Sequence, residues 1–512
     1  METFLIRALQ LILCFALLIT LHEGGHFLAA RMFKIRVDRF YLFFNPWFHL
    51  VSTYDKWVRR LLRLKPTEVP VEESKDEKGN IVKRKKYVGT EYGLGWLPLG
   101  GYVSIAGMID ENMDKEALRQ PAKPWEFRSK PAWQRLTVML AGVIVNFLTA
   151  LVIYAMVLFA WGDTYVPIEN MTHGFKFNER AQQLGFRDGD IPLRTETQSF
   201  TRFTDSQSIG DVYRAISEAR EVVVLRDGKE TTLSLPGDIN MLQMMKEQPP
   251  FMLALAPSVV DSVEAGTPAA AAGIRKGDRI VAFNDTAIAT WNEFTEQTAR
   301  LGDILTASAE AVTTDGALFG LFKKTTYRGN AADSLHVRTV SLGVMRAEGG
   351  VDTLHVVLSP ELTLGVRWNH PMASYKTRTT QYGFFESFPA GIAHGWNVLC
   401  GYVDDLKYLF TADGAKSVGS FGAIGSLFPA TWDWPRFWEM TAFISLMLAF
   451  MNILPIPALD GGHVLFLIYE MITRRKPSET FMIRAEYVGF GILILLMVVA
   501  NLNDVLRWLG YM

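Results

Sequence analysis

The stretch FALLITLHEGGHFLAARMF, Phe15 to Phe33, places three ionisable side chains, His22, Glu23 and His26, in the middle of an apolar segment. Apolar residues run with few breaks from Phe4 to Leu21 and resume at Phe27. A helix of this length can cross the core of a bilayer, which takes about 20 residues. An ionisable residue inside such a segment is costly and is by default a functional-site hypothesis. The stretch therefore predicts a membrane helix that carries chemistry.

The three ionisable residues form the motif H-E-x-x-H, made of His22, Glu23 and His26. On a helix, imidazoles at positions i and i+4 share one face and can bind one metal ion. The carboxylate beside them can accept a proton from a water molecule at the metal. The alternative is a pair of hydrogen-bonded core histidines with a paired glutamate. The membrane setting disfavours it, because polar groups are costly there.

The totals of the chain favour a membrane protein over a nucleic-acid-binding one. Its 512 residues suffice for several domains, and 49% of them are hydrophobic. The formal net charge of −1 gives no indication of nucleic-acid binding. The two cysteines, Cys14 and Cys400, lie far apart in the sequence. We therefore expect no structural disulfide, and a cysteine-based metal site is excluded.

Three further apolar segments predict membrane spans at Leu136–Trp161, Phe437–Ile472 and Tyr487–Leu506. The second of them is interrupted by Pro455 and Pro457. The N-terminal apolar segment has Arg7 as its only positive residue and no A-x-A-like cleavage site after it, which indicates a retained helix rather than a signal peptide. Four spans would place both termini on the same side of the membrane.

The basic residues next to these segments predict their orientation. They are Arg31, Lys34, Arg36 and Arg39 after the first span, Arg128, Lys130 and Arg135 before the second, and Arg474, Arg475 and Lys476 after the third. Loops rich in Lys and Arg are usually cytoplasmic. Both termini and the large region from about residue 162 to 436 are therefore expected to be extracytoplasmic.

Two stretches of this large region repeat one pattern, Asn178–Phe200 and Val263–Phe294. Each combines a helix start, a glycine, a Gly-Asp pair and an apolar strand, and resembles PDZ domains of the bacterial protease-associated type. The first glycine, Gly185 or Gly273, suits a helix C-cap, and the glycine of the pair suits a tight turn. The alternative is two unrelated β-rich domains. PDZ-like domains bind extended peptides by strand addition, so a chain end is one expected ligand. A size filter over the membrane site is the other expected role.

A catalytic zinc site takes three protein ligands and leaves a position open. The segment NILPIPALDGGHVLF, Asn452 to Phe466, offers a third ligand at membrane depth. Asp460 is an acid in an apolar setting, and His463 is its rival as a ligand. The alternative for Asp460 is a helix N-cap after the proline-rich break.

H-E-x-x-H in an early span, with N-x-x-P-x-P-x-L-D-G-G in a later one, resembles the site-2 protease family of intramembrane zinc metalloproteases. The order of parts is similar to its RseP-type (regulator of sigma-E protease) bacterial branch, with tandem PDZ domains between the second and third spans. The resemblance implies the following roles: His22, His26 and Asp460 as zinc ligands and Glu23 as catalytic base. It decides for Asp460 over His463, which becomes a neighbour of the site.

The same resemblance implies substrate-binding residues. The segment Gly93–Gly107 matches a re-entrant β-hairpin of the family, whose edge could hold a substrate as an extended strand. The residues implied are Gly100, Gly101 and Tyr102 in this segment, Asn452 and Pro455 in the third span, and Asn146 in the second. The alternatives are an ordinary loop hairpin, a simple helix kink and a hydrogen bond between helices. The chain departs from the family pattern at Gly142-Val143 and at Ser420–Ser426, which leaves open the local backbone shape there.

We thus expect a polytopic α-helical membrane protein with about four transmembrane helices, a membrane re-entrant β-hairpin and two extracytoplasmic PDZ-like α+β domains. The predicted parts are transmembrane helix 1 at 1–34, a cytoplasmic-side region at 35–130 with the hairpin at 93–108, transmembrane helix 2 at 131–161, PDZ-like domains at 162–250 and 251–370, an amphipathic surface-helix region at 371–436, and transmembrane helices 3 and 4 at 437–473 and 485–509. A helix buried in the external domain is the alternative for 371–436. The charged insertion at 66–87 is expected to be solvated, with a weaker possibility of contact between Lys83–Lys86 and anionic lipid.

The sequence predicts a zinc endopeptidase that cleaves single-pass membrane proteins within or near their transmembrane segment. By resemblance, it lies in the bacterial inner membrane, and its substrates include trimmed anti-sigma factors and remnant signal peptides. A membrane metal-ion transporter or sensor is the main alternative, although it would not need a glutamate between two ligands. An inactive adaptor built on the PDZ-like pair would be expected to lack part of the motif, which is complete here.

Overall fold

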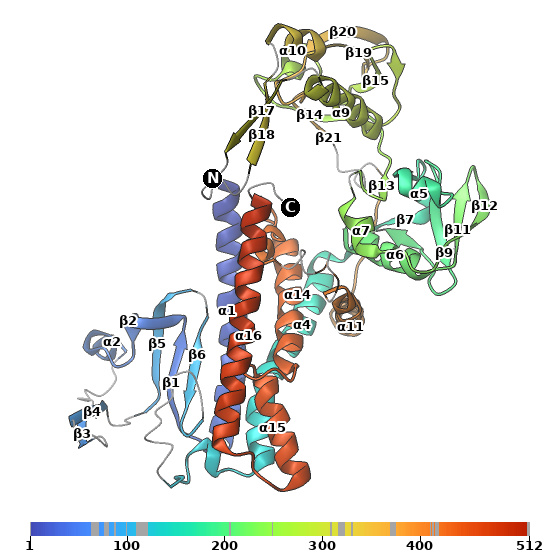
Figure 1. Ribbon diagram of the computed structural model, residues 1–512. Coiled ribbons are helices and arrows are strands. Elements are labelled where there is room, and N and C mark those ends of the chain that lie inside the picture. The colour runs from blue at the N-terminus through green and yellow to red at the C-terminus, as the bar shows by residue number, and fades with distance from the viewer. Residues whose placement is uncertain are drawn as a thin grey trace. The chain divides into compact units, whose positions relative to one another are not determined.

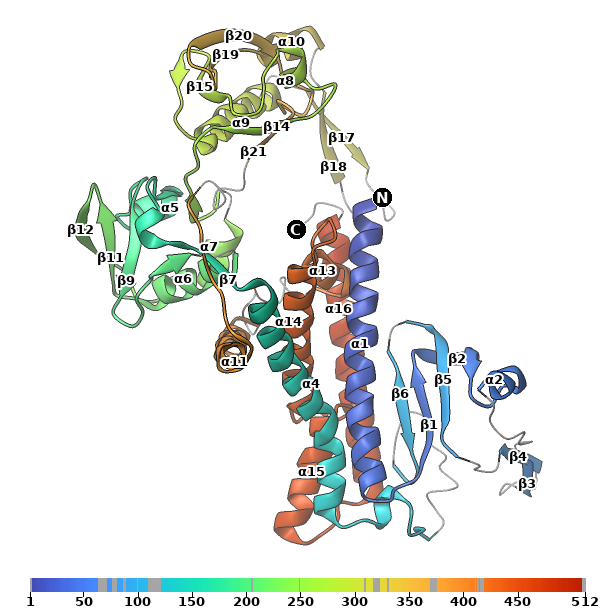
Figure 2. The same cartoon turned by 180° about the vertical axis from the view of Figure 1, so that it is seen from behind.

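The computed structural model describes most of the chain. The described residues are 2–62, 71–75, 81–85, 89–98, 100–108, 121–203, 206–247, 249–307, 310–315, 323–328, 331–368, 375–409, 411, 414 and 419–508. They form two compact units, which are described in turn (Figures 1 and 2). Unit 1 comprises residues 1–162 and 381–512, and unit 2 comprises residues 163–380.

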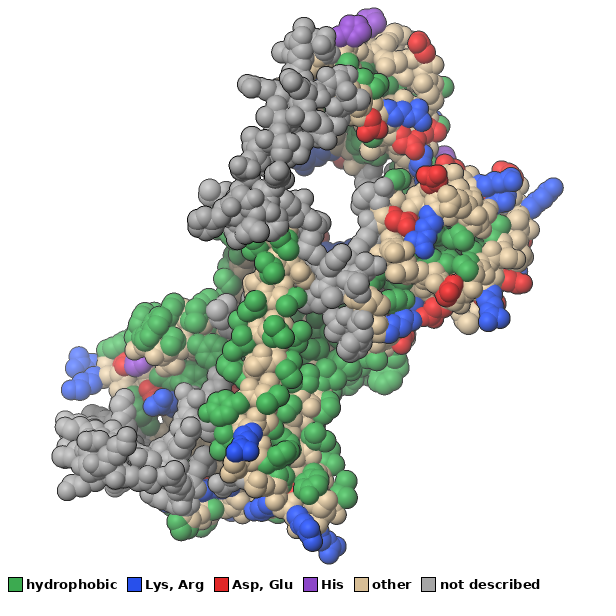
Figure 3. Space-filling model, in the orientation of Figure 1, with side chains coloured by type: hydrophobic (Ala, Val, Ile, Leu, Met, Phe, Trp, Pro, Cys, Tyr) green, Lys and Arg blue, Asp and Glu red, His purple; other side chains and the backbone are tan. Residues whose placement is uncertain are grey.

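Unit 1 is an assembly of helices with a small sheet beside it (Figure 1). Its helices are α1 (Glu2–Met32), α2 (Lys56–Leu61), α4 (Ala132–Trp161), α11 (Phe384–Leu409), α13 (Phe421–Ser426), α14 (Trp434–Ile453), α15 (Asp460–Thr473) and α16 (Glu479–Trp508). In the described part of the chain, three helices are long and apolar enough to cross a membrane: Thr3–Met32, Ala132–Trp161 and Thr480–Leu506. Exposed hydrophobic side chains line α16 in Figure 3, as expected of a surface that faces lipid. The chain is therefore a membrane protein.

The span expected at 437–473 is divided into two helices, α14 and α15. The link between them begins at Leu454 and ends at Leu459, which is the N-cap of α15. Pro455 and Pro457 lack the backbone N–H that a continuous helix would need, so the break follows from the sequence. Neither half is among the three helices that could span a membrane by length and composition. The number of four spans therefore stays a prediction.

Helix α4 is the centre of unit 1, since it packs against α1, α11, α14 and α15. Glycines bring these helices close together. A Cβ atom on Gly25 of α1 would lie 2.6 Å from the carbonyl oxygen of Ala141, and one on Gly391 of α11 would lie 2.5 Å from the backbone nitrogen of Ala155. Gly395, one turn later, makes a similar approach to α4. Small residues at such spacing allow backbones to approach, as is usual between membrane helices.

Helix α11 lies in the region that we expected to form an amphipathic surface helix. It packs against α4 and belongs to unit 1, so the alternative of a helix buried in the external domain is wrong. Its other face exposes large apolar side chains, including Phe385 at 84% and Trp396 at 57% of their surface. Such a face suits contact with lipid, and the amphipathic helix at the membrane surface stays a prediction.

A four-stranded sheet lies beside α1 in the order β2–β5–β1–β6 (Figures 1 and 2). Its strands are β1 (Val37–Leu42), β2 (Phe44–Ser52), β5 (Glu91–Leu97) and β6 (Tyr102–Ile105). Strand β1 is parallel to β5 and antiparallel to β6. The prediction of a β-hairpin over 93–108 is therefore wrong, because β1 lies between the two strands. The connection must instead cross two strand spacings, about 10 Å.

The glycines of this connection explain how the chain passes over β1. A Cβ atom on Gly100 would lie 2.6 Å from the ring of Phe44, and one on Gly101 would lie 2.6 Å from the carbonyl oxygen of Tyr41. Larger residues would push the connection away from the sheet. Strand β6 forms the edge of the sheet nearest to α1, with one side unpaired in the described strands.

The charged insertion expected at 66–87 is described only at two backbone strands. They are β3 (Val71–Lys75) and β4 (Ile81–Lys85), which pair antiparallel. The side chains of Lys83–Lys86, for which we considered contact with anionic lipid, lie outside the described residues.

Unit 2 contains two α+β domains. The first is built from β7 (Asp163–Pro167), β8 (Phe175–Phe177), α5 (Glu179–Gln183), β9 (Ile191–Thr195), β10 (Arg202–Phe203), α6 (Ser206–Glu218), β11 (Glu221–Arg226), β12 (Lys229–Ser234), α7 (Met241–Lys246), β13 (Met252–Ala254) and β22 (Arg378–Thr380). The second is built from β14 (Val260–Val263), α8 (Pro268–Ala271), β15 (Arg279–Phe283), β16 (Thr286–Ala287), α9 (Trp291–Ala307), β17 (Glu310–Asp315), β18 (Lys323–Arg328), α10 (Ala331–Arg338), β19 (Thr339–Met345), β20 (Val351–Val357) and β21 (Val366–Trp368).

Strand pairing places the domain limits differently from the sequence. Strand β13 pairs with β8, so residues 252–254 belong to the first domain, although we expected it to end at 250. Strand β22 pairs with β7, so unit 2 extends to residue 380 and not to 370. A three-residue strand carries little signal of its own in the sequence, since its partner decides its place.

The two domains share the turn that the sequence repeat predicts. Gly185 and Gly189 in the first domain have φ angles of 98° and 93°, and Gly273 and Gly277 in the second have 72° and 88°. These positive values favour glycine, which is why the repeat keeps it at these four positions.

A buried ion pair follows the turn in both domains. The Asp190 carboxylate pairs with Arg226 at 2.7 Å, and the Asp278 carboxylate pairs with Arg346 at 2.7 Å. Both aspartates are almost fully buried, and both arginines also donate to the carbonyl oxygen of the glycine that ends the preceding short helix. The second member of each pair was not visible in the sequence repeat. The shared arrangement argues against two unrelated domains, and the PDZ type itself stays a prediction.

Candidate metal centre

Helix α1 presents the H-E-x-x-H motif toward the interior of unit 1. His22 and His26 are one turn apart, and their side chains are 12% and 7% exposed. Their rings meet edge to face with centroids 4.8 Å apart. The two imidazoles therefore share one face of the helix, as the spacing predicts.

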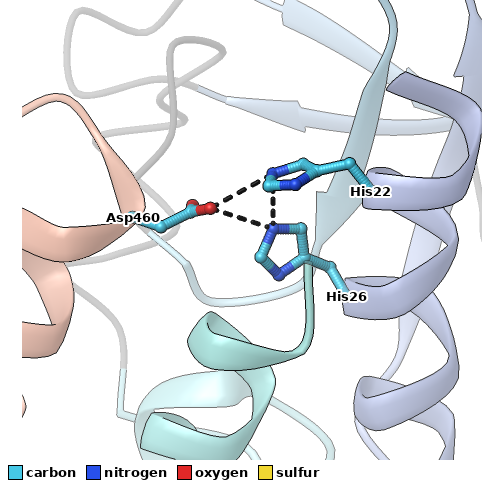
Figure 4. Close-up of side chains that lie close together, drawn as sticks. All are labelled: His22, His26 and Asp460. Carbon is cyan, nitrogen blue, oxygen red and sulfur yellow. Dashed lines mark hydrogen bonds and ion pairs between the residues drawn. The ribbon is translucent and has the colours of Figure 1, made fainter. Parts of the chain in front are cut away.

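Asp460 reaches the same place from the other end of the chain. It is the first residue of α15, and Figure 4 shows both rings of α1 pointing toward its carboxylate. The turn before it is tight. A Cβ atom on Gly461 would lie 2.0 Å from the carbonyl oxygen of Leu454, and one on Gly462 would lie 2.7 Å from that of Ile456. The two glycines thus allow the backbone of the proline-rich link to pack closely against the start of α15. This packing places Asp460 next to the two histidines.

The three side chains place one ligand atom each at a common point. The Asp460 Oδ2 atom lies 3.1 Å from His22 Nε2 and 3.4 Å from His26 Nε2, and the two Nε2 atoms are 3.2 Å apart. A tetrahedral zinc site with bonds of about 2.0–2.1 Å separates its ligand atoms by about 3.3–3.4 Å. The Asp460 Oδ2 atom is buried and accepts no hydrogen bond of normal geometry from any described residue. Both observations fit a metal ion better than a hydrogen-bonded cluster.

The remaining ring nitrogens have partners on α4. The Nδ1 atom of His26 lies 2.8 Å from the carbonyl oxygen of Val138. A carbonyl only accepts, so Nδ1 carries the hydrogen and Nε2 presents its lone pair to a metal. The Nδ1 atom of His22 lies 3.2 Å from Nδ2 of Asn146. Between these two contacts, Gly142 faces both rings: a Cβ atom there would lie 2.4 Å from His26 Nε2.

Two alternatives were considered for Asp460: a helix N-cap, and His463 as the metal ligand in its place. The N-cap of α15 is Leu459, and Asp460 stands one position later, so it is not the cap residue. His463 lies on the next turn with its Nε2 atom 3.4 Å from Oε1 of Glu486 on α16. Among the described residues, the group able to hold a metal contains Asp460 and not His463. The donor set of two imidazoles and one carboxylate is one that zinc uses in hydrolases.

Comparison with known proteins finds peptidases that are similar to almost the whole chain. The profile of peptidase family M50 matches residues 10–59 and 68–496, which is most of the chain. Protease RseP of Yersinia pestis is 27% identical over 509 residues, with 97% of both chains covered. The regulator of sigma-E protease RseP of Escherichia coli is 25% identical over 533 residues, with 99% of this chain and 100% of the relative covered. The regulator of sigma E protease of Haemophilus influenzae is 27% identical over 527 residues, with 97% and 98% covered.

The chain belongs to peptidase family M50.

Membership of family M50 confirms the resemblance to the site-2 protease family. It also confirms the predicted enzyme class, an intramembrane metalloendopeptidase, and zinc as the metal that this family uses. A transporter or an inactive adaptor is not favoured. The individual roles of His22, Glu23, His26 and Asp460 are not tested by membership and remain predictions.

The catalytic base expected in this M50 enzyme lies between the metal centre and the sheet. Glu23 is next to His22 in sequence, and its carboxyl group lies beside the backbone of Val103 in β6. The edge strand and the candidate base are therefore neighbours. This arrangement suits a peptide that lies along β6 with its backbone facing Glu23.

The other predicted substrate-binding residues are not gathered at the three ligand atoms. Asn452 is half-buried in the last turn of α14, and Pro455 is exposed in the link. Gly101 approaches α1 at Ile19, and Tyr102 donates a hydrogen bond to Asn45 Oδ1 at 3.0 Å. No contact of these residues with the ligand atoms is recorded in the described ranges, and their role stays a prediction.

Two polar pairs of unit 1 were missed in the sequence. Arg135 of α4 pairs with Glu470 of α15 at 2.5 Å, and both side chains are mostly buried. Glu486, the partner of His463, sits at the start of the apolar segment of α16. An acid in such a place is itself a functional signal, which could have identified Glu486. Arg135 had been assigned only to the basic flank.

Proposed function

We propose that this M50 peptidase holds zinc through His22, His26 and Asp460 and cleaves membrane proteins within or near their transmembrane segment. One observation carries the proposal: side chains from α1 and α15 bring three ligand atoms to within 3.1–3.4 Å of one another. The ordinary alternative, a hydrogen-bonded polar cluster, is weakened by the buried carboxylate oxygen without a well-formed bond.

The role proposed for Glu23 is general base and then general acid. Zinc, when bound, supplies Lewis acidity that lowers the pKa of a water molecule and polarises a peptide carbonyl. The Glu23 carboxylate accepts one proton from the attacking water. The same carboxyl group returns the proton to the leaving amide nitrogen as the C–N bond breaks. The products are a new carboxylic acid, which keeps the second proton of the water, and a new amine, and Glu23 ends in its starting state.

The substrate is proposed to bind as an added strand on β6. A transmembrane helix hides its amides in internal hydrogen bonds, so its peptide bonds must be exposed before cleavage. The edge of β6 that pairs with no other described strand offers replacement hydrogen bonds to an unwound segment, next to Glu23. The residues proposed to support this segment are Gly100, Gly101 and Tyr102 before and within β6, and Asn452 and Pro455 at the break between α14 and α15.

The proposed setting is a bacterial inner membrane, with four spans and both termini and unit 2 extracytoplasmic. The relatives named as regulators of sigma E support an anti-sigma factor, already trimmed outside the membrane, as one substrate. Remnant signal peptides are the other proposed substrate class. The PDZ-like pair is proposed to exclude proteins with large external domains, or to bind a chain end exposed by a previous cut.

The test is cleavage of a single-pass reporter whose external domain has been removed. Wild type, Glu23→Gln and Asp460→Asn are purified as full chains, and bound zinc is quantified in each. We expect wild type to cleave, Glu23→Gln to hold zinc without cleaving, and Asp460→Asn to hold less zinc.

Two results would contradict the proposal. Cleavage by Glu23→Gln at the wild-type rate would show that Glu23 is not the catalytic base. Full zinc occupancy in Asp460→Asn, together with a loss of zinc in His463→Ala, would transfer the third ligand to His463.

A further inference from the structure

The side chain of Asn146 is the polar group on α4 whose role the proposed function leaves open. It is fully buried in an otherwise apolar helix. Its Nδ2 atom lies 3.2 Å from Nδ1 of His22, and its Oδ1 atom has no hydrogen-bond partner in the part of the chain that is described. Leaving a buried polar atom unpaired is costly. A buried amide kept at this cost next to a candidate zinc ligand points to a function.

The comparison with His26 shows what that function requires. The Val138 carbonyl can only accept, so it fixes the hydrogen of His26 on Nδ1 and leaves Nε2 free for a metal. His22 faces an amide instead, which can donate through Nδ2 or accept through Oδ1. Only the accepting orientation places the hydrogen of His22 on Nδ1 and frees its Nε2 atom. The donating orientation leaves the hydrogen on Nε2, which lies 3.1 Å from Asp460 Oδ2.

The spacing along α4 supports a common purpose for these groups. Val138, Gly142 and Asn146 follow one another at intervals of four residues, so they lie on one face of the helix. That face provides a carbonyl for His26, a gap for both rings and an amide for His22. The backbone at Asn146 is held separately, because its carbonyl oxygen accepts a hydrogen bond from Ser445 Oγ on α14 at 2.7 Å.

We infer that Asn146 is a positioning residue for His22. With its Oδ1 atom turned toward His22 Nδ1, the amide orients the ring and selects the tautomer whose Nε2 atom binds zinc. This role replaces the contact with substrate that the family resemblance implies for Asn146. The inference rests on the proposed function, since it takes His22 as a zinc ligand.

The test compares the zinc affinity of full-length variants by competition with a chelator. In Asn146→Leu the volume is similar and the acceptor is lost, so we expect affinity to fall about 10- to 100-fold, as for other partners of ligand histidines. In Asn146→Asp the acceptor remains, and we expect affinity within about tenfold of wild type. Ser445→Ala is the control for helix packing, because it removes the bond to the Asn146 backbone and leaves the amide; its affinity should equal that of wild type.

Three outcomes would overturn the inference and leave the proposed function standing. The first is an Asn146→Leu chain that binds zinc like wild type but cleaves poorly, which would make Asn146 a substrate contact. The second is equal weakening by Leu and Asp, and the third is equal weakening by Asn146→Leu and Ser445→Ala; both would reduce Asn146 to packing. A wild-type chain without zinc affinity would instead contradict the proposed function itself.

Discussion

The close approach of α4 to the two histidines predicts that Gly142→Ala will damage the metal centre. The added Cβ atom would lie 2.4 Å from His26 Nε2 and 2.7 Å from His22 Cε1. Ordinary van der Waals contact begins at 3.4 Å, so the ring of His26 would have to move by about 1 Å. The ring is not free to do so, because its Nδ1 atom is bonded to the Val138 carbonyl. The helices cannot separate easily either, since Gly25 packs against the backbone of Ala141.

The size of the effect follows from this displacement. A misplacement of about 1 Å in a reacting group can lower activity about 100-fold. Disturbing the surroundings of a metal ligand typically lowers metal affinity about 10- to 100-fold. We therefore expect Gly142→Ala to bind zinc about 10- to 100-fold more weakly and to cleave at least about 100-fold more slowly. Unfolding is not the expected cause, because Ala is favoured over Gly in a helix interior by about 1 kcal/mol.

The matched control is Gly24→Ala, within the motif on α1. A Cβ atom at Gly24 meets nothing within 4 Å among the described atoms, yet the gain in helix propensity is the same. Zinc affinity by chelator competition and cleavage of the truncated reporter are measured for both variants. Wild-type zinc affinity and cleavage in Gly142→Ala would refute the argument from close approach. Equal losses in the two variants would show that the glycines act through backbone flexibility and not through space.

Three further predictions concern packing and stability. In Gly391→Leu, the side chain would strike α4 near Ala155, so we expect faster proteolysis of α11 in the folded chain, whereas the exposed Ile392→Ala should leave the rate unchanged. In Asp278→Asn, Arg346 loses its buried partner and keeps Asp352, so unfolding of unit 2 followed by proteolysis in urea should become easier by about 1–3 kcal/mol. The exposed pair of Asp261 with Lys276 should change stability by less than about 1 kcal/mol when Asp261→Asn breaks it. Burial raises the pKa of Tyr213 above its ordinary value of about 10. The stabilising contribution of the neutral Tyr213 side chain is therefore complete below about pH 10 and is lost as the pH rises through the folded-state pKa. Tyr213→Phe should reduce the alkaline loss of stability in the same urea assay.

The candidate metal centre could be proposed from the sequence because His22 and His26 are signalled by side-chain type and spacing, and the family resemblance decided for Asp460 over His463. Two histidines four residues apart and an acid before two glycines are unusual in apolar helices. Each of the two motifs supports the interpretation of the other as part of one metal site. Of the sheet, only the segment 93–108 was predicted, as a β-hairpin that the family resemblance implies. The resemblance does not reveal that β1, about fifty residues earlier, lies between the two strands. Pairing partners are a property of the whole fold, which is why the hairpin prediction failed.

The groups around the metal centre were harder to predict for a different reason. The partner of His26 is a backbone carbonyl, which every residue has, so the identity of Val138 carries no signal. The contribution of Gly142 is the absence of a side chain, and a glycine in a membrane helix usually indicates only helix packing. Asn146 did carry a signal, since a buried amide in a spanning helix is costly. The sequence does not show which group forms a hydrogen bond with that amide. The metal ligands of such a site can thus be proposed from the sequence alone. The groups of α4 that contact these ligands can be identified only from the packing of α4 against α1. That packing explains the interval of four residues from Val138 to Gly142 to Asn146, since it places all three next to the histidines.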